Sequence, residues 1–144
     1  MKKGIIVGII VAILVVIGFA IYIMQSDTDR YRSIQARTNQ NGNIVDMASS
    51  GFSPSVLKIK AGDTVTFLSI DNNSHWPASA IHPTHTLYPG SDIRKCGTTE
   101  EKMIFDACRG LSEGQEYKFT FTNKGSWKYH DHLAPKLQGT IEVN

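Results

Sequence analysis

The stretch EYKFTFT at residues 116–122 alternates aromatic residues with lysine and threonine. Tyr117, Phe119 and Phe121 occupy every second position, and every second side chain of a β-strand lies on the same face. The stretch therefore predicts a strand that turns an aromatic face toward a core and a polar face toward water.

Similar short runs, rich in β-branched and aromatic residues, recur on both sides of this stretch and are separated by Gly, Asp, Asn and Pro. The predicted strands are residues 44–47, 56–59, 64–70, 116–122, 126–130 and 140–143. Many short strands with turn residues between them are typical of a β-sandwich or barrel. Residues 43–144 are thus expected to form one all-β domain, without an internal repeat in the sequence.

The first 42 residues have a different composition. Residues 1–3 carry two lysines, residues 4–24 carry no charge, and residues 25–42 are polar without a regular apolar period. A helix of about 20 apolar residues crosses a hydrocarbon core of roughly 30 Å, whereas the apolar core of a secretory signal has about 7–15 residues. We therefore expect a short flank (1–3), an uncleaved transmembrane anchor (4–24) and a polar linker (25–42) before the domain.

Basic residues flank the apolar run on both sides, so their number does not fix the orientation of the anchor. The lysine pair directly before the run is typical of a signal anchor, and two cysteines suit an oxidising compartment. The prediction is a single-pass membrane protein whose C-terminal domain lies outside the cytoplasm.

Both cysteines, Cys96 and Cys108, fall in residues 86–111, a segment with little alternation. A disulfide would close a loop of about a dozen residues and contribute roughly 3 kcal/mol. We favour this bridge over thiolate ligation of a metal, because neither cysteine has a metal-type spacing to a histidine. Two free buried thiols are the alternative.

Charge argues against nucleic-acid binding. Beyond the two lysines of the first 24 residues, the chain has 13 basic and 13 acidic residues, and no run of Lys or Arg interleaved with aromatics. A nucleic-acid-binding surface requires a basic patch. The partners expected from the sequence are therefore a metal ion and, through the anchor, a membrane.

All five histidines lie in two short segments: His75, His82 and His85 in the first, His130 and His132 in the second. Imidazole is the commonest protein ligand for borderline metals, so the two segments together indicate one metal site. His130 and His132 are two residues apart, which puts them on one face of an extended strand. Clustering in the sequence does not by itself require that the segments meet in space, and isolated histidines are usually ordinary polar residues.

Several segments carry a family resemblance. Residues 51–54, 57–59 and 61–67, followed by His75, resemble the first half of a cupredoxin of the plastocyanin or amicyanin type, and residues 105–106, 117–121 and 125–143 resemble its later strands and its final copper loop. The resemblance covers about residues 43–144. It implies a Greek-key β-sandwich with His75 as the first copper ligand.

The resemblance fails at the remaining ligands of a blue copper centre. Asp131, Ala134 and Leu137 stand where the amicyanin-like loop has cysteine, histidine and methionine. A blue copper centre needs the cysteine thiolate. The segment from His130 to His132 instead resembles the paired-histidine segment of multicopper oxidases, which bind copper without sulfur.

These observations predict a copper ion held by His75, His85, His130 and His132, with His82 as the less favoured alternative to His85. Copper(II) is preferred over zinc or nickel on intrinsic affinity. Asp131 is either an acceptor that orients a ligating histidine or a solvated loop residue. Trp76, Trp127 and Tyr129 are candidates to wall the site, and Trp127 and Tyr129 are preferred as core residues.

The function expected from the sequence is that of a membrane-anchored, extracytoplasmic copper-binding protein. The alternatives are an electron carrier with atypical ligands and a metal-free interaction module on the same fold. Oxidase activity is not expected, since multicopper oxidases need several such domains and a sulfur-ligated copper. The sequence also has no Gly-x-Ser-x-Gly turn or paired-carboxylate motif that would indicate a hydrolase.

Overall fold

A computed structural model describes residues 14–25, 28 and 42–144 of the 144-residue chain. Residues 14–25 are helical. Among the described residues, no helix has both the length and the apolar character needed to cross a membrane. Much of the predicted anchor and nearly all of the predicted linker lie outside the described residues. Asn43–Asn144 form one compact unit.

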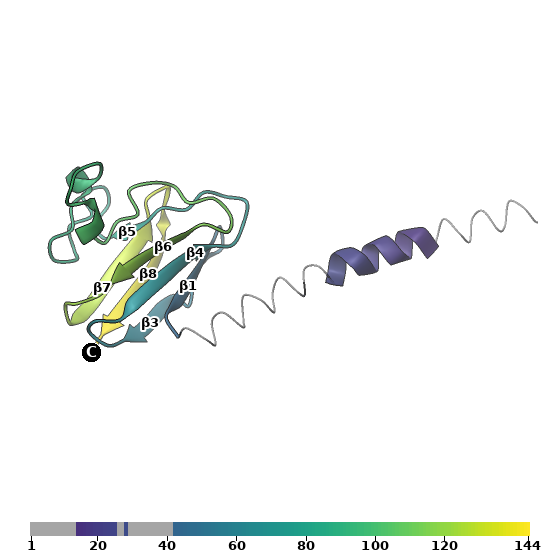
Figure 1. The fold of residues 1–144 in the computed structure, drawn as a ribbon, viewed down its shortest axis with the longest axis horizontal. Coiled ribbons are helices and arrows are strands. Elements are labelled where there is room, and N and C mark those ends of the chain that lie inside the picture. Colours follow the sequence, from purple (N-terminus) through teal and green to yellow (C-terminus); the bar gives the residue numbers. More distant parts are fainter. Residues whose placement is uncertain (1–13, 26–27, 29–41) are drawn as a thin grey trace, which may run out of the picture. The chain divides into compact units, whose positions relative to one another are not determined.

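This unit is a sandwich of two four-stranded β-sheets (Figure 1). The first sheet has the order β2-β1-β4-β6, and its strands are β2 (Gly51–Ser53), β1 (Ile44–Ala48), β4 (Thr64–Ser69) and β6 (Glu116–Thr120). The second sheet has the order β3-β8-β7-β5, and its strands are β3 (Val56–Ile59), β8 (Ala134–Val143), β7 (Gly125–Asp131) and β5 (Pro77–Ser79). Two pairs are parallel, β1 with β4 and β3 with β8, and the other pairs are antiparallel.

All six strands predicted from the sequence are present, with ends that shift by one or two residues except in β8. The prediction missed β2 and β5, which have only three residues each and are too short to show a period of two. It also began the last strand at Thr140, whereas β8 begins at Ala134 and pairs with β7 along its whole length. The first half of β8 is exposed or half-buried. This part of the strand therefore shows no apolar alternation in the sequence.

Aromatic rings fill the space between the sheets. Phe119 and Phe121 are buried in the core, as their alternation predicts, while Lys118 and Thr120 of the same strand are exposed. Phe67 of β4 meets Tyr129 of β7 edge to face, with ring centroids 5.2 Å apart. Such ring pairs add about 0.5–1.5 kcal/mol each to the energy of burial. The core therefore ties β7 to the opposite sheet and holds its position.

The long segment between β5 and β6 contains two 3₁₀ helices, η1 (Ile93–Lys95) and η2 (Glu101–Met103), which stand beside the end of the sandwich that carries β5 in Figure 1. The predicted disulfide is present: Cys96 and Cys108 are joined, with Cα atoms 5.3 Å apart. After η2 the chain returns to the sheet, where Asp106 forms a bridge with Ala78 of β5. The segment is thus fixed against the edge of the second sheet.

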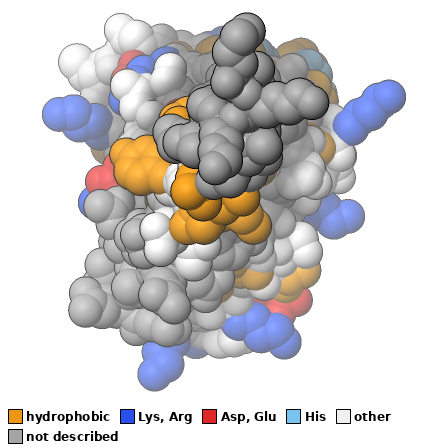
Figure 2. All heavy atoms as spheres, turned by 90° about the vertical axis from the view of Figure 1, so that its right-hand side faces the viewer, with side chains coloured by type: hydrophobic (Ala, Val, Ile, Leu, Met, Phe, Trp, Pro, Cys, Tyr) orange, Lys and Arg blue, Asp and Glu red, His pale blue; other side chains and the backbone are white. Residues whose placement is uncertain are grey.

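Lys and Arg side chains project singly around the face of the molecule in Figure 2 and do not gather there among the described residues. Among the described residues, Lys58 is paired with an acid across strands, Glu142 at 3.3 Å. Exposed pairs of this kind contribute at most about 1 kcal/mol.

Candidate metal centre

Four histidines meet beside β5 and β7. The ligand atoms of His82, His85, His130 and His132 all lie within 4.8 Å of one another. Nitrogens that bind one ion at about 2.0–2.1 Å lie at most roughly 4.2 Å apart. Small side-chain movements would therefore bring all four onto one ion.

Strand β7 supplies two of these side chains. His130 lies opposite Ala78 in the pairing of β7 with β5 and opposite Gln138 in its pairing with β8. Just beyond the strand, the backbone N–H of His132 donates to the carbonyl of Trp76 at 2.7 Å. The positions of His130 and His132 are therefore set by main-chain hydrogen bonds of the sheet and its edge.

The loop after β5 supplies the other two. The backbone N–H of His85 donates to the carbonyl of Ile81 at 2.8 Å, which closes a turn around His82. His85 has a φ of 58°, in the left-handed region that non-glycine residues adopt uncommonly. Its side chain is fully buried, whereas His82 is exposed.

A buried carboxylate orients His85. Oδ2 of Asp106 lies 2.5 Å from Nδ1 of His85, and both side chains are excluded from solvent. Oδ1 of Asp106 accepts hydrogen bonds from Nε1 of Trp76 at 2.6 Å and from the backbone N–H of Cys108 at 2.8 Å. Because a carboxylate only accepts, Nδ1 of His85 carries a proton, so that in the neutral ring the lone pair is on Nε2. A carboxylate behind the imidazole is the usual support of a metal-binding histidine.

Nε2 of His85 faces the cluster, where it is hydrogen-bonded to Nδ1 of His132 at 3.0 Å. Two nitrogens on one ion at about 2.0–2.1 Å lie roughly 2.8–3.4 Å apart, so this pair already has the spacing of a shared ion. The charge of Asp106 is also maintained. Burial alone would raise the pKa of its carboxyl, but the hydrogen bonds from His85, Trp76 and Cys108 hold the pKa below its ordinary value.

His130 contributes a nitrogen without a partner. The residue is 3% exposed, and Nε2 is buried with no hydrogen-bond partner among the described residues. Burial, followed by the nearby positive charge of the other three histidines, lowers the pKa of His130 to about 4. The ring is therefore neutral at physiological pH, as metal ligation requires. Burial also lowers the pKa of His132.

A buried, unpaired polar atom costs about 1–3 kcal/mol. A metal ion in the cluster would give Nε2 of His130 the partner it lacks, so the residues present fit such an ion. The indole of Trp76 covers one side, with its ring centroid 4.4 Å from that of His132. Tyr129 belongs to the sandwich core, as the sequence predicts, and the half-buried Trp127 packs against that core.

His75 is not part of this cluster, and the predicted ligand set is corrected here. Nδ1 of His75 lies 2.8 Å from Oδ2 of Asp131, and Nε2 lies 2.8 Å from Oδ1 of Asp71, so both ring nitrogens are engaged by carboxylates. Burial would lower the pKa of His75, but the two carboxylates outweigh it and raise the pKa. Asp131, the last residue of β7, contacts His75, while His130 and His132 on either side of it join the other histidines.

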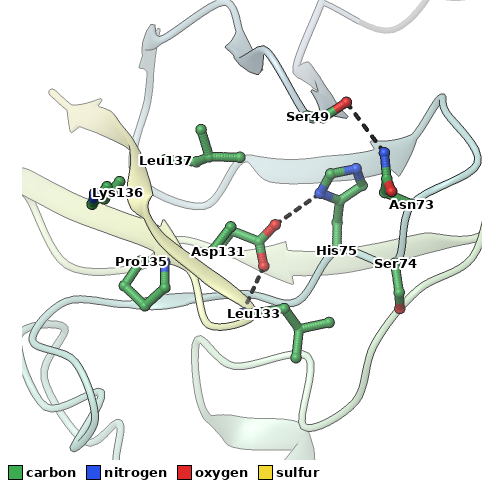
Figure 3. Close-up of a pocket in the computed structure, with 10 residues that line it drawn as sticks. Ser49, Asn73, Ser74, His75, Asp131, Leu133, Pro135, Lys136 and Leu137 are labelled. Carbon is green, nitrogen blue, oxygen red and sulfur yellow. Dashed lines mark hydrogen bonds and ion pairs between the residues drawn. The ribbon is translucent and has the colours of Figure 1, made fainter.

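The side of β7 that faces His75 has a pocket of about 520 Å³, shown in Figure 3. Asp131, Ala134 and Leu137 line it, which are the three positions where the resemblance places cysteine, histidine and methionine. None of these three side chains offers sulfur or imidazole. In this chain, the residues at the position of a blue copper centre therefore do not fit such a centre. Asp131 does orient a histidine, but the histidine is His75.

The prediction from the sequence did not include Asp106 as a functional residue, and it favoured His85 over His82 as a ligand. No local signal connects Asp106 with His85, since 21 residues separate them and only the folded chain joins them. From their spacing, either His82 or His85 could face the segment that carries His130 and His132. In the structure, the turn between them brings both histidines to that segment.

Comparison with known proteins supports the fold described above. No family model matches the chain. The chloroplastic plastocyanin of Silene latifolia subsp. alba is 30% identical over 95 residues, which are 65% of this chain and 52% of that protein. Plastocyanin A/B of Petroselinum crispum is 26% identical over 95 residues, 65% of this chain and 87% of the relative. The chain spans about half the length of the chloroplastic plastocyanins that it matches.

Solved structures agree. A reduced Cu(I) form of amicyanin matches with a TM-score of 0.52 and 21% identity, over 71% of this chain and 81% of amicyanin. The Cu-containing nitrite reductase of Thermus scotoductus SA-01 matches with a TM-score of 0.53 and 23% identity, over 71% of this chain and 22% of the reductase.

The fold is accordingly that of a cupredoxin-like β-sandwich. Over 95 residues the chain is similar to plastocyanins. At the positions where the resemblance places the cysteine and methionine of a blue copper centre it has Asp131 and Leu137, and its two cysteines form a disulfide.

Proposed function

We propose that this chain is a copper-binding cupredoxin-like protein whose ion is held by His82, His85, His130 and His132. The observation that carries the proposal is the buried, unpartnered Nε2 of His130, which lies among three further imidazoles. The neutral state of His130 and the carboxylate behind His85 support it, because both prepare the rings to ligate.

Copper is the preferred ion for two reasons. An all-imidazole site suits copper, zinc and nickel, and copper(II) has the highest intrinsic affinity of the three for such ligands. The solved structures of similar fold include a Cu(I) form of amicyanin and a Cu-containing nitrite reductase. Bound copper would supply a one-electron couple and a Lewis acid. The chain's own residues bind and orient it, with Asp106 behind His85 and Trp76 shielding one side.

We further propose that the domain is anchored in a membrane and lies outside the cytoplasm. The uncharged run of residues 4–24 supports the anchor, and the Cys96–Cys108 disulfide supports an oxidising compartment. Fusion of a reporter that works only outside the cytoplasm to the C-terminus would test the orientation. Release of the protein from membranes by high salt, without detergent, would contradict the anchor.

The test of the metal proposal is a titration of the chain with copper(II), followed by electron paramagnetic resonance and absorbance. The expected result is one copper per chain, a tetragonal signal with nitrogen hyperfine structure and no intense blue band. His130→Ala and His132→Ala should abolish tight binding. His75→Ala is the matched control, because it removes an equally buried imidazole from the other side of β7. Equal losses in all three variants, or no tight binding by the unchanged chain, would favour the metal-free interaction module.

A further inference from the structure

The four histidines of the cluster are not held equally. His85 is fully buried and bound through Nδ1 to Asp106. His130 is buried on β7 between two paired strands. His132 is half-buried, its backbone is bonded to Trp76, and its ring lies against the indole of that residue. Three of the four imidazoles are thus fixed before an ion arrives.

His82 differs in every respect. It is exposed, it lies in the irregular loop after β5, and it has no carboxylate partner among the described residues. Its ring contacts are with other imidazoles, at centroid distances of 6.3 Å to His85, 5.3 Å to His130 and 4.9 Å to His132. Its neighbour Ile81 is 63% exposed and does not pack against the core. Ordering such a side chain on an ion costs rotamer entropy that the other three have already lost.

We infer that the centre consists of three fixed ligands, His85, His130 and His132, and one displaceable ligand, His82. An external monodentate donor, such as a free imidazole or azide, takes the position of His82 at the ion. In that exchange one nitrogen lone pair leaves the metal and another enters, without a change in oxidation state. Three protein ligands with one exchangeable position are the arrangement by which metal sites admit outside molecules.

This inference rests on the proposed function and goes beyond it, because it assigns the centre a ligand-admitting position on its solvent side. His82 is the side chain of the cluster nearest to water, so an incoming donor meets it first. Displacing His85 or His130 would require opening the buried contacts with Asp106 or with the sheet.

The experiment compares the full chain with His82→Ala, His82→Gln and His130→Ala, each given one equivalent of copper(II) and titrated with imidazole and with azide. Paramagnetic resonance reports the ligand change, the azide charge-transfer band reports its binding, and circular dichroism reports folding. His82→Ala and His82→Gln should keep one copper per chain, with an affinity below that of the unchanged chain. Both should bind imidazole and azide more tightly than the unchanged chain, and His130→Ala should lose copper more completely.

Two results would overturn the inference while leaving the proposed function intact. One is loss of copper by folded His82→Ala and His82→Gln as complete as in His130→Ala. The other is a copper-loaded His82→Ala whose spectrum does not respond to imidazole or azide. Failure of the unchanged chain to bind copper would instead remove both proposals together.

Discussion

Replacing Asp106 with asparagine separates the orienting role of this side chain from its size. Oδ1 of Asp106 already accepts two hydrogen bonds, from Trp76 and from the Cys108 backbone, so the amide oxygen of the variant keeps that position. The NH₂ group then faces Nδ1 of His85, where the carboxylate now lies 2.5 Å away. Two donors cannot share that contact. His85 must move its proton from Nδ1 to Nε2, which removes the lone pair that points into the cluster.

The magnitude follows from the contact that is lost. Loss of the carboxylate behind a metal-binding histidine lowers metal affinity by about 10–100-fold. This corresponds to about 1.4–2.8 kcal/mol of binding free energy. In the metal-free chain, loss of the charged hydrogen bond should lower the free energy of unfolding by about 1–3 kcal/mol. The pKa of Asp106 is depressed in the folded chain, so its stabilisation is present above pH ~3.9 and is lost as the pH falls through the folded value. The difference between variant and unchanged chain should therefore shrink in acid.

The assay is competition for copper(II) with a chelator of known affinity at neutral pH, with unfolding by urea measured in parallel. Asp92→Asn is the matched control, because Asp92 also accepts from a side chain and a backbone N–H, those of Arg94, but at the surface and outside the cluster. That control should bind copper as the unchanged chain does. If Asp106→Asn also binds copper within about twofold of the unchanged chain, then Asp106 does not set the copper affinity through the tautomer of His85.

Three further predictions concern stability. Since the pKa of His130 falls from 6.5 to about 4 on folding, the metal-free chain should lose up to about 3 kcal/mol as the pH drops from 6.5 to 4, and His130→Leu should lack this loss in urea titrations. The raised pKa of His75 stabilises the fold fully below pH 6.5 and less as the pH rises through the folded value, so His75→Gln should be most destabilising in mild acid, with copper affinity unchanged in the chelator assay. Replacing Cys96 and Cys108 with serine should lower the free energy of unfolding by about 3 kcal/mol, measured by urea denaturation, and should weaken copper binding, because Cys108 helps to position Asp106.

The strands with a strong period of two were predictable from the sequence, because local alternation and the buried face agree there. Residues 116–122 show this most clearly, since Phe119 and Phe121 enter the core as expected. β5 was not predictable: Pro77–Ser79 is recognisable as a strand only through its pairing with β7. Pairing between distant segments is absent from any local pattern.

The composition of the cluster was predictable in part. The two segments that carry His82, His85, His130 and His132 do meet. The sequence could suggest this because histidines confined to two short segments are unusual unless they form one site. The contact of Asp106 with His85 could not be predicted from the sequence, since nothing in the local sequence sets this aspartate apart in its irregular segment. Whether the cluster binds copper stays a prediction.

The error at His75 has a simple origin in the geometry of β7. The resemblance to cupredoxins assigned His75 to the same ion as His130 and His132, but that family's ligand on this strand corresponds to residue 131. Residues 130 and 132 differ from it by one position, and a shift of one residue along a strand turns a side chain to the opposite face. His75 therefore meets Asp131, and the two histidines meet the loop after β5. Side chains at positions 130 and 132 therefore lie away from the position that the resemblance assigns to copper, and they lie beside the loop that carries His82 and His85.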